Sequence, residues 1–163
     1  MAKKSAKNEP AKGPATIQNR RATFDYHVED TLETGIELRG SEVKSLFLGR
    51  ANLTDSYCRV KNDELWVYQM DIEPYAYAHH FLPERRRDRK LLAKRKEISV
   101  LERKSLEKGL SLVPLKVYFN DRGRAKLLLG LCRGKKDYDK RTAIAERETK
   151  RETARVQRGD YRD

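Results

Sequence analysis

The carboxylates and histidines of this sequence are the side chains that could support hydrolytic or metal chemistry. Six acids fall between residues 25 and 42: Asp25, Glu29, Asp30, Glu33, Glu37 and Glu42. Carboxylates that share a divalent ion can cleave a phosphodiester, so a metal-dependent nuclease is one hypothesis. Acids at alternating strand positions are, however, typical of a solvated face. Because no nucleophile elbow, phosphate-cradling glycine loop or Cys–His motif accompanies them, we expect that the protein is not an enzyme.

The histidines and cysteines do not form a recognisable metal-binding pattern. His79 and His80 are adjacent, and neighbours on an extended chain point to opposite sides, so one metal ion is hard for both to reach. Cys58 and Cys132 lack the four-ligand spacing of a zinc site, and we expect two reduced, buried cysteines. The sequence therefore predicts no metal, no cofactor and no small-molecule substrate.

Positive charge is the strongest compositional signal, with a formal net charge of +12 over 163 residues. Residues 1–22, 85–96 and 133–163 carry net charges of +5, +7 and +4, and the remaining residues sum to −4. Such segregation is typical of a protein that binds a polyanion, with nucleic acid favoured over an anionic membrane surface. No run approaches the roughly 20 apolar residues of a membrane span, and the first residues lack the apolar middle of a secretory signal. We expect a cytoplasmic protein without a membrane partner.

The internal basic cluster is ERRRDRKLLAKRKE, residues 84–97. The pattern predicts that it opens a helix over residues 87–108, which ends at Lys108 and Gly109. Phosphate contacts are the favoured role, because each neutralised phosphate releases counterions, and a solvated helix face is the alternative. The candidate contacts are Arg85, Arg86, Arg87, Arg89 and Lys90.

The C-terminal segment, residues 133–163, has helix-forming composition but almost nothing apolar to bury. A helix over residues 138–158 would align Lys140, Ile144, Arg147, Arg151, Arg155 and Arg158 on one side. Ile144 and Val156 are its only large apolar residues, so packing cannot hold it. We expect this tail to be disordered alone and to fold on a polyanion; a permanently disordered solubility tail is the alternative.

The rest of the chain predicts a mainly β domain over residues 18–132, preceded by a disordered basic arm over residues 1–17. Residues 24–38 are expected to form two strands joined near Glu33–Gly35, and Ser41 to cap a short helix that ends at Gly49. Residues 54–72 predict a hairpin with Asn62 and Asp63 in its turn, and residues 110–134 predict a second hairpin around Gly123. About six strands with two to three helices indicate a small β-barrel like the oligonucleotide-binding fold.

Four runs of residues resemble a known family. They are NRRATFDY (19–26), ETGIELRGSEVKSL (33–46), VPLKVYFNDRGRAKLLLGL (113–131) and RGKKDYDKR (133–141). These runs resemble the small protein B family, the SsrA-binding proteins of bacterial trans-translation, from about Thr16 to the end of the chain. The resemblance implies an oligonucleotide-binding-fold barrel that binds the tRNA-like domain of transfer-messenger RNA. It also implies delivery of the alanyl-charged RNA, with elongation factor Tu and GTP, to stalled ribosomes for rescue and peptide tagging.

Residue roles follow from the same resemblance. Asn19 and Glu33 match positions associated with RNA binding, with Arg20, Arg21 and Lys44 as phosphate-side neighbours. In the family the tail enters the empty mRNA path as a helix. The run placed at the ribosomal RNA of the decoding centre is Gly134, Lys135, Lys136, Tyr138, Asp139, Lys140 and Arg141, and the stripe residues Arg147, Arg151 and Arg155 would extend it. The sequence departs from the family in two places: Tyr138 stands where many members have His, and Phe47 where many have Arg.

One non-enzymatic alternative to this adaptor remains. A basic RNA chaperone with a single surface would also explain the composition, and its RNA affinity would follow total charge and fall uniformly with salt.

Overall fold

The computed structural model describes residues 13–78 and 82–135, and residues 144, 146, 148–151 and 153 of the tail. The described residues between 13 and 135 form nine strands and three helices. The strands are β1 (Ile17–Gln18), β2 (Tyr26–Ile36), β3 (Ala51–Asn52), β4 (Tyr57–Lys61), β5 (Glu64–Tyr68), β6 (Asp71–Ile72), β7 (Arg89–Leu92), β8 (Ser111–Phe119) and β9 (Ala125–Gly134). The helices are α1 (Arg20–Asp25), α2 (Gly40–Phe47) and α3 (Arg95–Lys108).

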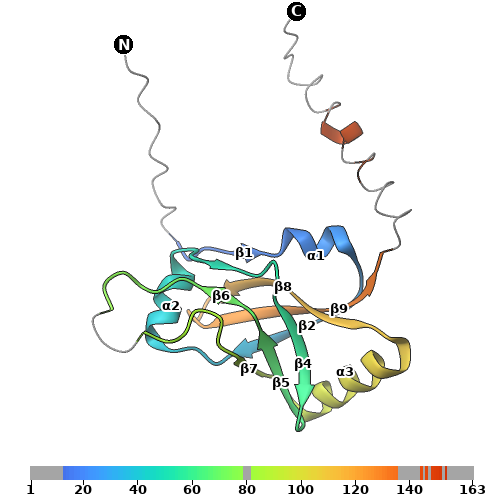
Figure 1. Cartoon of the computed structure of the whole chain (residues 1–163), viewed down its shortest axis with the longest axis horizontal. Helices are drawn as coiled ribbons and strands as arrows, with labels where there is room; N and C mark the ends of the chain where they lie inside the picture. Colours follow the sequence, from blue (N-terminus) through green and yellow to red (C-terminus); the bar gives the residue numbers. More distant parts are fainter. Residues whose placement is uncertain are drawn as a thin grey trace, which may run out of the picture.

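Six of these strands close into a ring (Figure 1). The order around the ring is β8, β4, β5, β7, β2 and β9, and β9 pairs again with β8; all of these pairs are antiparallel. The short β1 pairs with β8 as well, and β3 and β6 form a separate two-stranded sheet. Closure removes free sheet edges, which is how small barrels avoid edge-to-edge association. The prediction of a mainly β small barrel of about six strands is confirmed.

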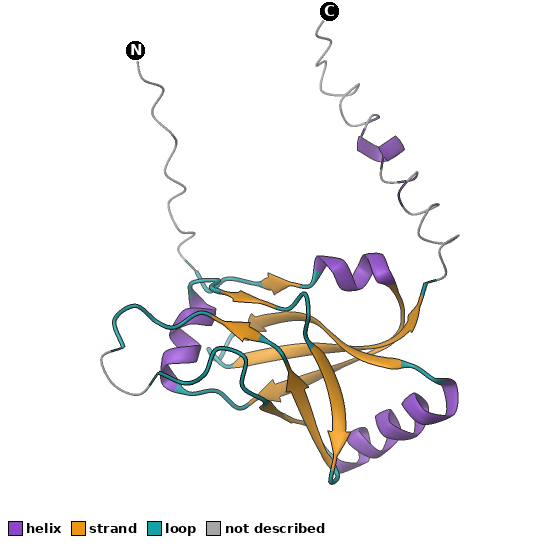
Figure 2. Ribbon diagram, viewed as in Figure 1, coloured by secondary structure: helices purple, strands orange, loops and turns teal. Residues whose placement is uncertain are grey.

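The core fills the ring because alternate residues of each strand point inward. Leu65, Val67, Leu91, Leu127 and Leu129 are almost completely buried there. The helices contribute fewer residues to the same core, namely Leu46 from α2 and Ile98 and Leu101 from α3. Figure 2 shows α2 and α3 on different sides of the barrel, α2 on the left and α3 at the lower right.

Two turns form as the sequence predicts. Asn62 and Asp63 both have positive φ, 52° and 59°, which is the conformation of the tight turn that joins β4 to β5. Gly123 has φ of 69° in the turn between β8 and β9, and Gly109 ends α3 with φ of 59°.

The prediction of two strands over residues 24–38 is wrong. β2 is one strand that continues through Glu33, Thr34 and Gly35, with Thr34 buried. Gly35 packs closely on β7, because a Cβ there would lie 3.1 Å from the Cβ of Leu92 and Leu92 would have to shift slightly. The helix α1 before it was not predicted.

The predicted start of the helix over residues 87–108 is also wrong. Residues Arg89–Leu92 form β7, which pairs with both β5 and β2, and the helix begins only at Arg95. Ser41 does not cap α2 either. The N-cap is Arg39, whose backbone N–H donates to the Glu42 carboxylate at 2.8 Å.

Arg89 points into the barrel and is completely buried. Its Nε and Nη2 donate to Oε1 of Glu42 on α2, at 2.9 and 2.8 Å. The remaining N–H groups donate to main-chain carbonyls, so all five donors of the guanidinium are used. These carbonyls belong to Met70 (2.6 Å), Arg87 (3.0 Å) and Arg85 (2.9 Å).

The Glu42 carboxylate is the buried acceptor on the other side of this ion pair. Burial pushes its pKa upward, but hydrogen bonds from Arg87, the Arg39 N–H and Arg89 outweigh burial, and the net effect lowers the pKa of Glu42. Burial lowers the pKa of Arg89, against the attraction of Glu42. Both groups stay charged at neutral pH, and the pair joins α2, β7 and the end of β5. The prediction that Arg89 contacts phosphate is therefore wrong, because its side chain is completely buried.

Replacing Arg89 tests this role. Arg89→Met should lower the free energy of unfolding by about 3 kcal/mol, because Glu42 stays buried without its main partner. Urea unfolding followed by circular dichroism measures the loss. The control is Arg86→Met in the same basic cluster, which is half exposed and should change stability by less than about 0.5 kcal/mol. Equal losses in the two variants would contradict a special role for the buried pair.

Candidate nucleic-acid interface

Glu33 lies on the outer surface of β2 within a group of polar and basic side chains, which we call the Glu33 centre. It comprises Glu33, Tyr118 and Lys116 of β8, and Lys126 of β9. The strand register brings them together. Leu128 of β9 lies opposite both Glu33 and Lys116, and Lys126, two residues earlier, lies opposite both Gly35 and Tyr118. The Tyr118 hydroxyl donates to the Glu33 carboxylate, and Lys126 Nζ lies 3.4 Å from it. Lys116 Nζ lies 4.9 Å from the centre of the Tyr118 ring.

These contacts fix the charge state of the centre. The hydrogen bond from Tyr118 lowers the pKa of Glu33, with Lys126 and Lys116 acting in the same direction, and the same bond raises the pKa of Tyr118. At neutral pH the centre presents an ionised carboxylate and a neutral phenol beside two lysine side chains. A carboxylate accepts from base amino groups and ribose hydroxyls, whereas ammonium groups bind phosphates, so both halves of a nucleotide find partners here.

Asn19 is buried and holds a neighbouring helix in place. Its Nδ2 donates to the carbonyls of Leu53 and Pro114, both at 3.0 Å, and its Oδ1 accepts from the Ala22 N–H at 3.1 Å. The side chain thereby caps α1 and ties it to β8. Asn19 therefore positions its neighbours, because both of its donors are used and the side chain has almost no exposed surface. Its association with RNA binding stays a prediction.

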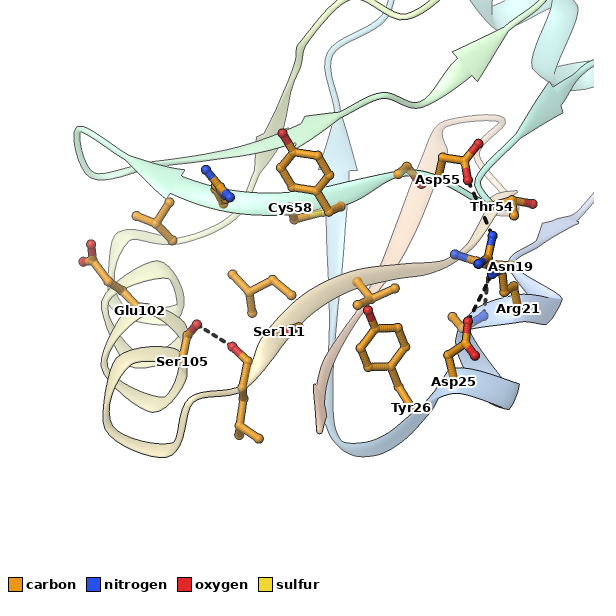
Figure 3. A pocket seen from close by; sticks show the side chains of 18 of the residues that line it. Asn19, Arg21, Asp25, Tyr26, Thr54, Asp55, Cys58, Glu102, Ser105 and Ser111 are labelled. Carbon is orange, nitrogen blue, oxygen red and sulfur yellow. Dashed lines mark hydrogen bonds and ion pairs between the residues drawn. The ribbon is translucent and has the colours of Figure 1, made fainter. Parts of the chain in front are cut away.

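Arg20 and Arg21 are the exposed basic residues that α1 presents. Figure 3 shows Arg21 between Asp25 and Asp55, with nitrogen–oxygen distances of 3.1 and 3.8 Å. Arg21 lines an open groove of about 670 Å³, together with residues of β4, the start of β8 and the end of α3. The same view looks into this groove. Both arginines are accessible at one end of the barrel wall.

The exposed members of the internal basic cluster have acidic neighbours. Arg85 makes a two-point ion pair with Asp71, at 2.8 and 3.0 Å, and Arg86 lies 3.9 Å from the same carboxylate. Lys90 pairs with Glu64 on the neighbouring strand. These three cations remain accessible, whereas Arg87 is mostly buried against Glu42. The cluster is therefore split between the surface and the interior.

Lys44 and the first tail residues complete the predicted set. Lys44 is exposed on α2, with its Nζ 5.2 Å from the centre of the Tyr75 ring. Lys135, which follows Gly134 at the end of β9, is tied to α1: its N–H donates to the Asp25 carbonyl at 2.9 Å and its Nζ to the Thr23 carbonyl at 3.1 Å. The tail therefore leaves the barrel beside α1.

Most of the predicted tail contacts lie outside the described residues. These are Lys136, Tyr138, Asp139, Lys140, Arg141, Arg147 and Arg155. Arg151 is described, and it is exposed and helical. The Thr153 hydroxyl donates to the Thr149 carbonyl at 2.8 Å, one helical turn earlier. Whether the tail is disordered alone stays a prediction.

Sequence reasoning missed Tyr118, Lys116 and Lys126 as members of the site. They alternate with the buried Val117 and Leu127 on the hairpin of β8 and β9. That alternation places them on the outer face, but only the register with β2 shows that Glu33 lies beside them.

The metal and membrane hypotheses find no support among the described residues. No group of three potential metal ligands occurs there, while His79 and His80 lie outside that part of the chain. No helix among the described residues is long and apolar enough to cross a membrane. The prediction of two unpaired buried cysteines is confirmed, and burial raises the pKa of Cys132 to about 11.

Comparisons with known proteins agree on one family. The family model described as SmpB protein matches residues 16–159. The chain is 56% identical to an SsrA-binding protein of Moorella thermoacetica over 140 residues, covering 86% of this chain and 90% of that one. It is 50% identical to an SsrA-binding protein of Thermobifida fusca over 159 residues, covering 97% and 98%. A solved structure described as "tmRNA-SmpB: a journey to the center of the bacterial ribosome" has a TM-score of 0.64 and 48% identity, and the match covers 75% of this chain and 85% of that one.

Substitution of Asn19 tests whether this residue positions α1 or contacts RNA directly. Asn19→Ala should lower the free energy of unfolding by about 2 kcal/mol, because α1 loses its cap and two buried carbonyls lose their donor. Thermal and urea unfolding measure the change. The exposed neighbour Gln18 provides the control, since Gln18→Ala should have an effect below about 0.5 kcal/mol. If Asn19→Ala weakened RNA binding with stability unchanged, direct contact would be the better account.

Proposed function

The chain belongs to the SmpB protein family, and from this premise we propose that it is a non-catalytic RNA-binding adaptor of trans-translation. It binds the tRNA-like domain of transfer-messenger RNA and brings that RNA to stalled ribosomes in the cytoplasm. Elongation factor Tu with GTP takes part through the charged RNA. The observation that carries this proposal is the Glu33 centre, an exposed carboxylate flanked by two lysines on the wall that β2, β8 and β9 share.

The tail supplies the second half of the proposed function. It starts from a fixed point beside α1, where the main chain and side chain of Lys135 are both bonded. In the empty mRNA path, ribosomal RNA would provide the polyanion on which the tail forms a helix. The run from Gly134 to Arg141 would then lie at the decoding centre in place of codon pairing.

The Glu33 centre makes the first prediction of this proposal. Glu33→Ala should weaken binding to the isolated tRNA-like domain by at least about tenfold, since hydrogen bonds to a charged group contribute roughly 1.5–3 kcal/mol. Fluorescence anisotropy at near-physiological salt measures the affinity, with an unrelated structured RNA of equal length as reference. The matched control is Glu37→Ala, which removes the same charge from an exposed position just beyond β2. Equal losses for the two variants and both RNAs would favour the single-surface, charge-driven alternative.

The tail makes a separate prediction. A chain that ends at Gly134 should keep nearly full affinity for the tRNA-like domain, because it retains the Glu33 centre and α1. It should lose peptide tagging, because it lacks the tail. Tagging in a reconstituted stalled translation reaction measures the second outcome. A truncated chain that bound this RNA as poorly as Glu33→Ala would contradict the division of labour between barrel and tail.

A further inference from the structure

Three aromatic side chains and an arginine share the outer face of the β4–β5 hairpin. Tyr57 and Tyr68 lie directly opposite each other with stacked rings, 5.3 Å between centres and 14° between planes. Arg59 lies opposite Trp66, and its guanidinium carbon is 5.2 Å from the centre of the Tyr57 ring. We call Tyr57, Arg59, Trp66 and Tyr68 the aromatic platform.

The core does not account for these rings. They alternate with Cys58, Leu65 and Val67, which point inward and are almost completely buried. Tyr57 is 38% exposed, and Trp66 and Tyr68 are half-buried on the outer face. The barrel already has a full set of inward residues, so large aromatic rings on the outside indicate contact with a partner.

The charges around the platform favour an anionic partner. Arg59 and Lys61 are exposed on β4, and Lys90 lies opposite Trp66 on β7. Three acids also lie nearby: Glu64, which pairs with Lys90, and Asp55 and Glu102, which line the groove beside Tyr57 and Arg59. Planar rings interleaved with cations are the arrangement with which proteins bind unpaired nucleotides, because bases stack on the rings and phosphates meet the cations.

A groove adjoins the platform and extends this surface. In the described part of the chain, β4 and β8 pair only at Cys58 and Leu112, so the two strands diverge on either side of this point. The lining of the resulting groove of about 670 Å³ includes Tyr57 and Arg59 of β4 and Arg21 of α1. Figure 3 shows Arg21 beside Asp55 in this groove. An extended strand that crosses the platform therefore has a path along the barrel.

Glu33 on β2 and Lys126 on β9 lie across the barrel from the platform, because β4 is three strands away from β2 and β5 is three strands away from β9 in the ring of six strands. Lys116 and Tyr118 lie on β8, which neighbours β4 but pairs with it only at Leu112, four residues before Lys116. An RNA held at the Glu33 centre would therefore leave the platform uncovered. Two opposite walls with separate sets of cations can contact two RNA strands at the same time.

We propose that the aromatic platform binds unpaired nucleotides of a second RNA strand, distinct from the one held at the Glu33 centre. Bases stack on Tyr57, Tyr68 and Trp66, while Arg59 and Lys61 contact the phosphates. This surface goes beyond the proposed binding of the tRNA-like domain, and it does not depend on that proposal. Because every base has a flat face, the platform should accept many sequences.

Trp66 gives a direct signal, because it is the only tryptophan of the chain. The probe is an unstructured adenosine-rich RNA of about 12 nucleotides, within the site sizes that single oligonucleotide-binding folds cover. Titration of the full chain with this RNA should quench the Trp66 fluorescence, and excess tRNA-like domain should leave most of the quenching in place.

The test variant is the double substitution Tyr57→Leu with Tyr68→Leu, which keeps apolar bulk but removes both rings. It should bind the probe at least about fivefold more weakly, the low end of stacking contributions per base, with unchanged affinity for the tRNA-like domain. Tyr57→Phe should bind as the wild type does, because it keeps the ring. The matched control is Tyr77→Leu, which removes a tyrosine that is 75% exposed in the loop between β6 and β7.

Two outcomes would overturn the proposal. One is a wild-type chain whose Trp66 fluorescence the probe does not change. The other is a double variant that binds the probe as the wild type does, which would leave the platform to a protein partner. A failure of Glu33→Ala to affect the tRNA-like domain would count against the proposed function alone, because the two walls are measured with different RNAs.

Discussion

The buried pair of Glu42 and Arg89 is the interaction on which the rest of this barrel depends. A guanidinium inside an apolar core is tolerated only when every donor is used and its charge is matched, and Glu42 with three main-chain carbonyls meets both conditions. The pair fixes β7 between β5 and β2, and without β7 the ring of six strands would stay open. The opposition of the two outer walls, and hence of the Glu33 centre and the aromatic platform, follows from that closure.

Two residues that the sequence associates with RNA binding, Asn19 and Arg89, hold other parts of the protein in place. The Asn19 side chain donates to the carbonyls of Leu53 and Pro114 and accepts from α1, and Arg89 uses all of its donors within the barrel. Polar side chains with such full sets of partners gain little from an RNA and lose much when mutated. Loss of RNA affinity on mutation therefore identifies a contact only when stability is measured beside it. Glu33 differs from both residues, because its carboxylate is half accessible to a ligand.

Local sequence signals predicted those elements that local chemistry determines. Asn62 and Asp63 accept positive φ, and Gly123 does the same, so both hairpins were predictable. Gly35 has no such signature: it looks like a turn residue, but it lies inside β2 beside Leu92, more than fifty residues away, where a side chain would make a tight contact. β7 was read as the start of a helix because its basic residues resemble a solvated face, and only the distant Glu42 explains why Arg89 points inward. Glu33 itself was predicted, but its neighbour Lys126 was not, because the pairing of distant strands and not the spacing in the sequence brings Lys126 beside it.

The geometry of the closed ring also connects the barrel to the tail. β9 pairs with β2 along the Glu33 wall and ends where Lys135 binds the last turn of α1, so the origin of the tail is fixed relative to that wall. Asn19 caps the first turn of the same helix. A change in α1 would thus alter the exit point of the tail and the placement of Arg20 and Arg21 together. The groove at the divergence of β4 and β8 runs from the platform on β4 and β5 to Arg21 of this helix. α1 therefore couples the Glu33 wall to the tail, whereas the platform meets α1 only at the far end of the groove.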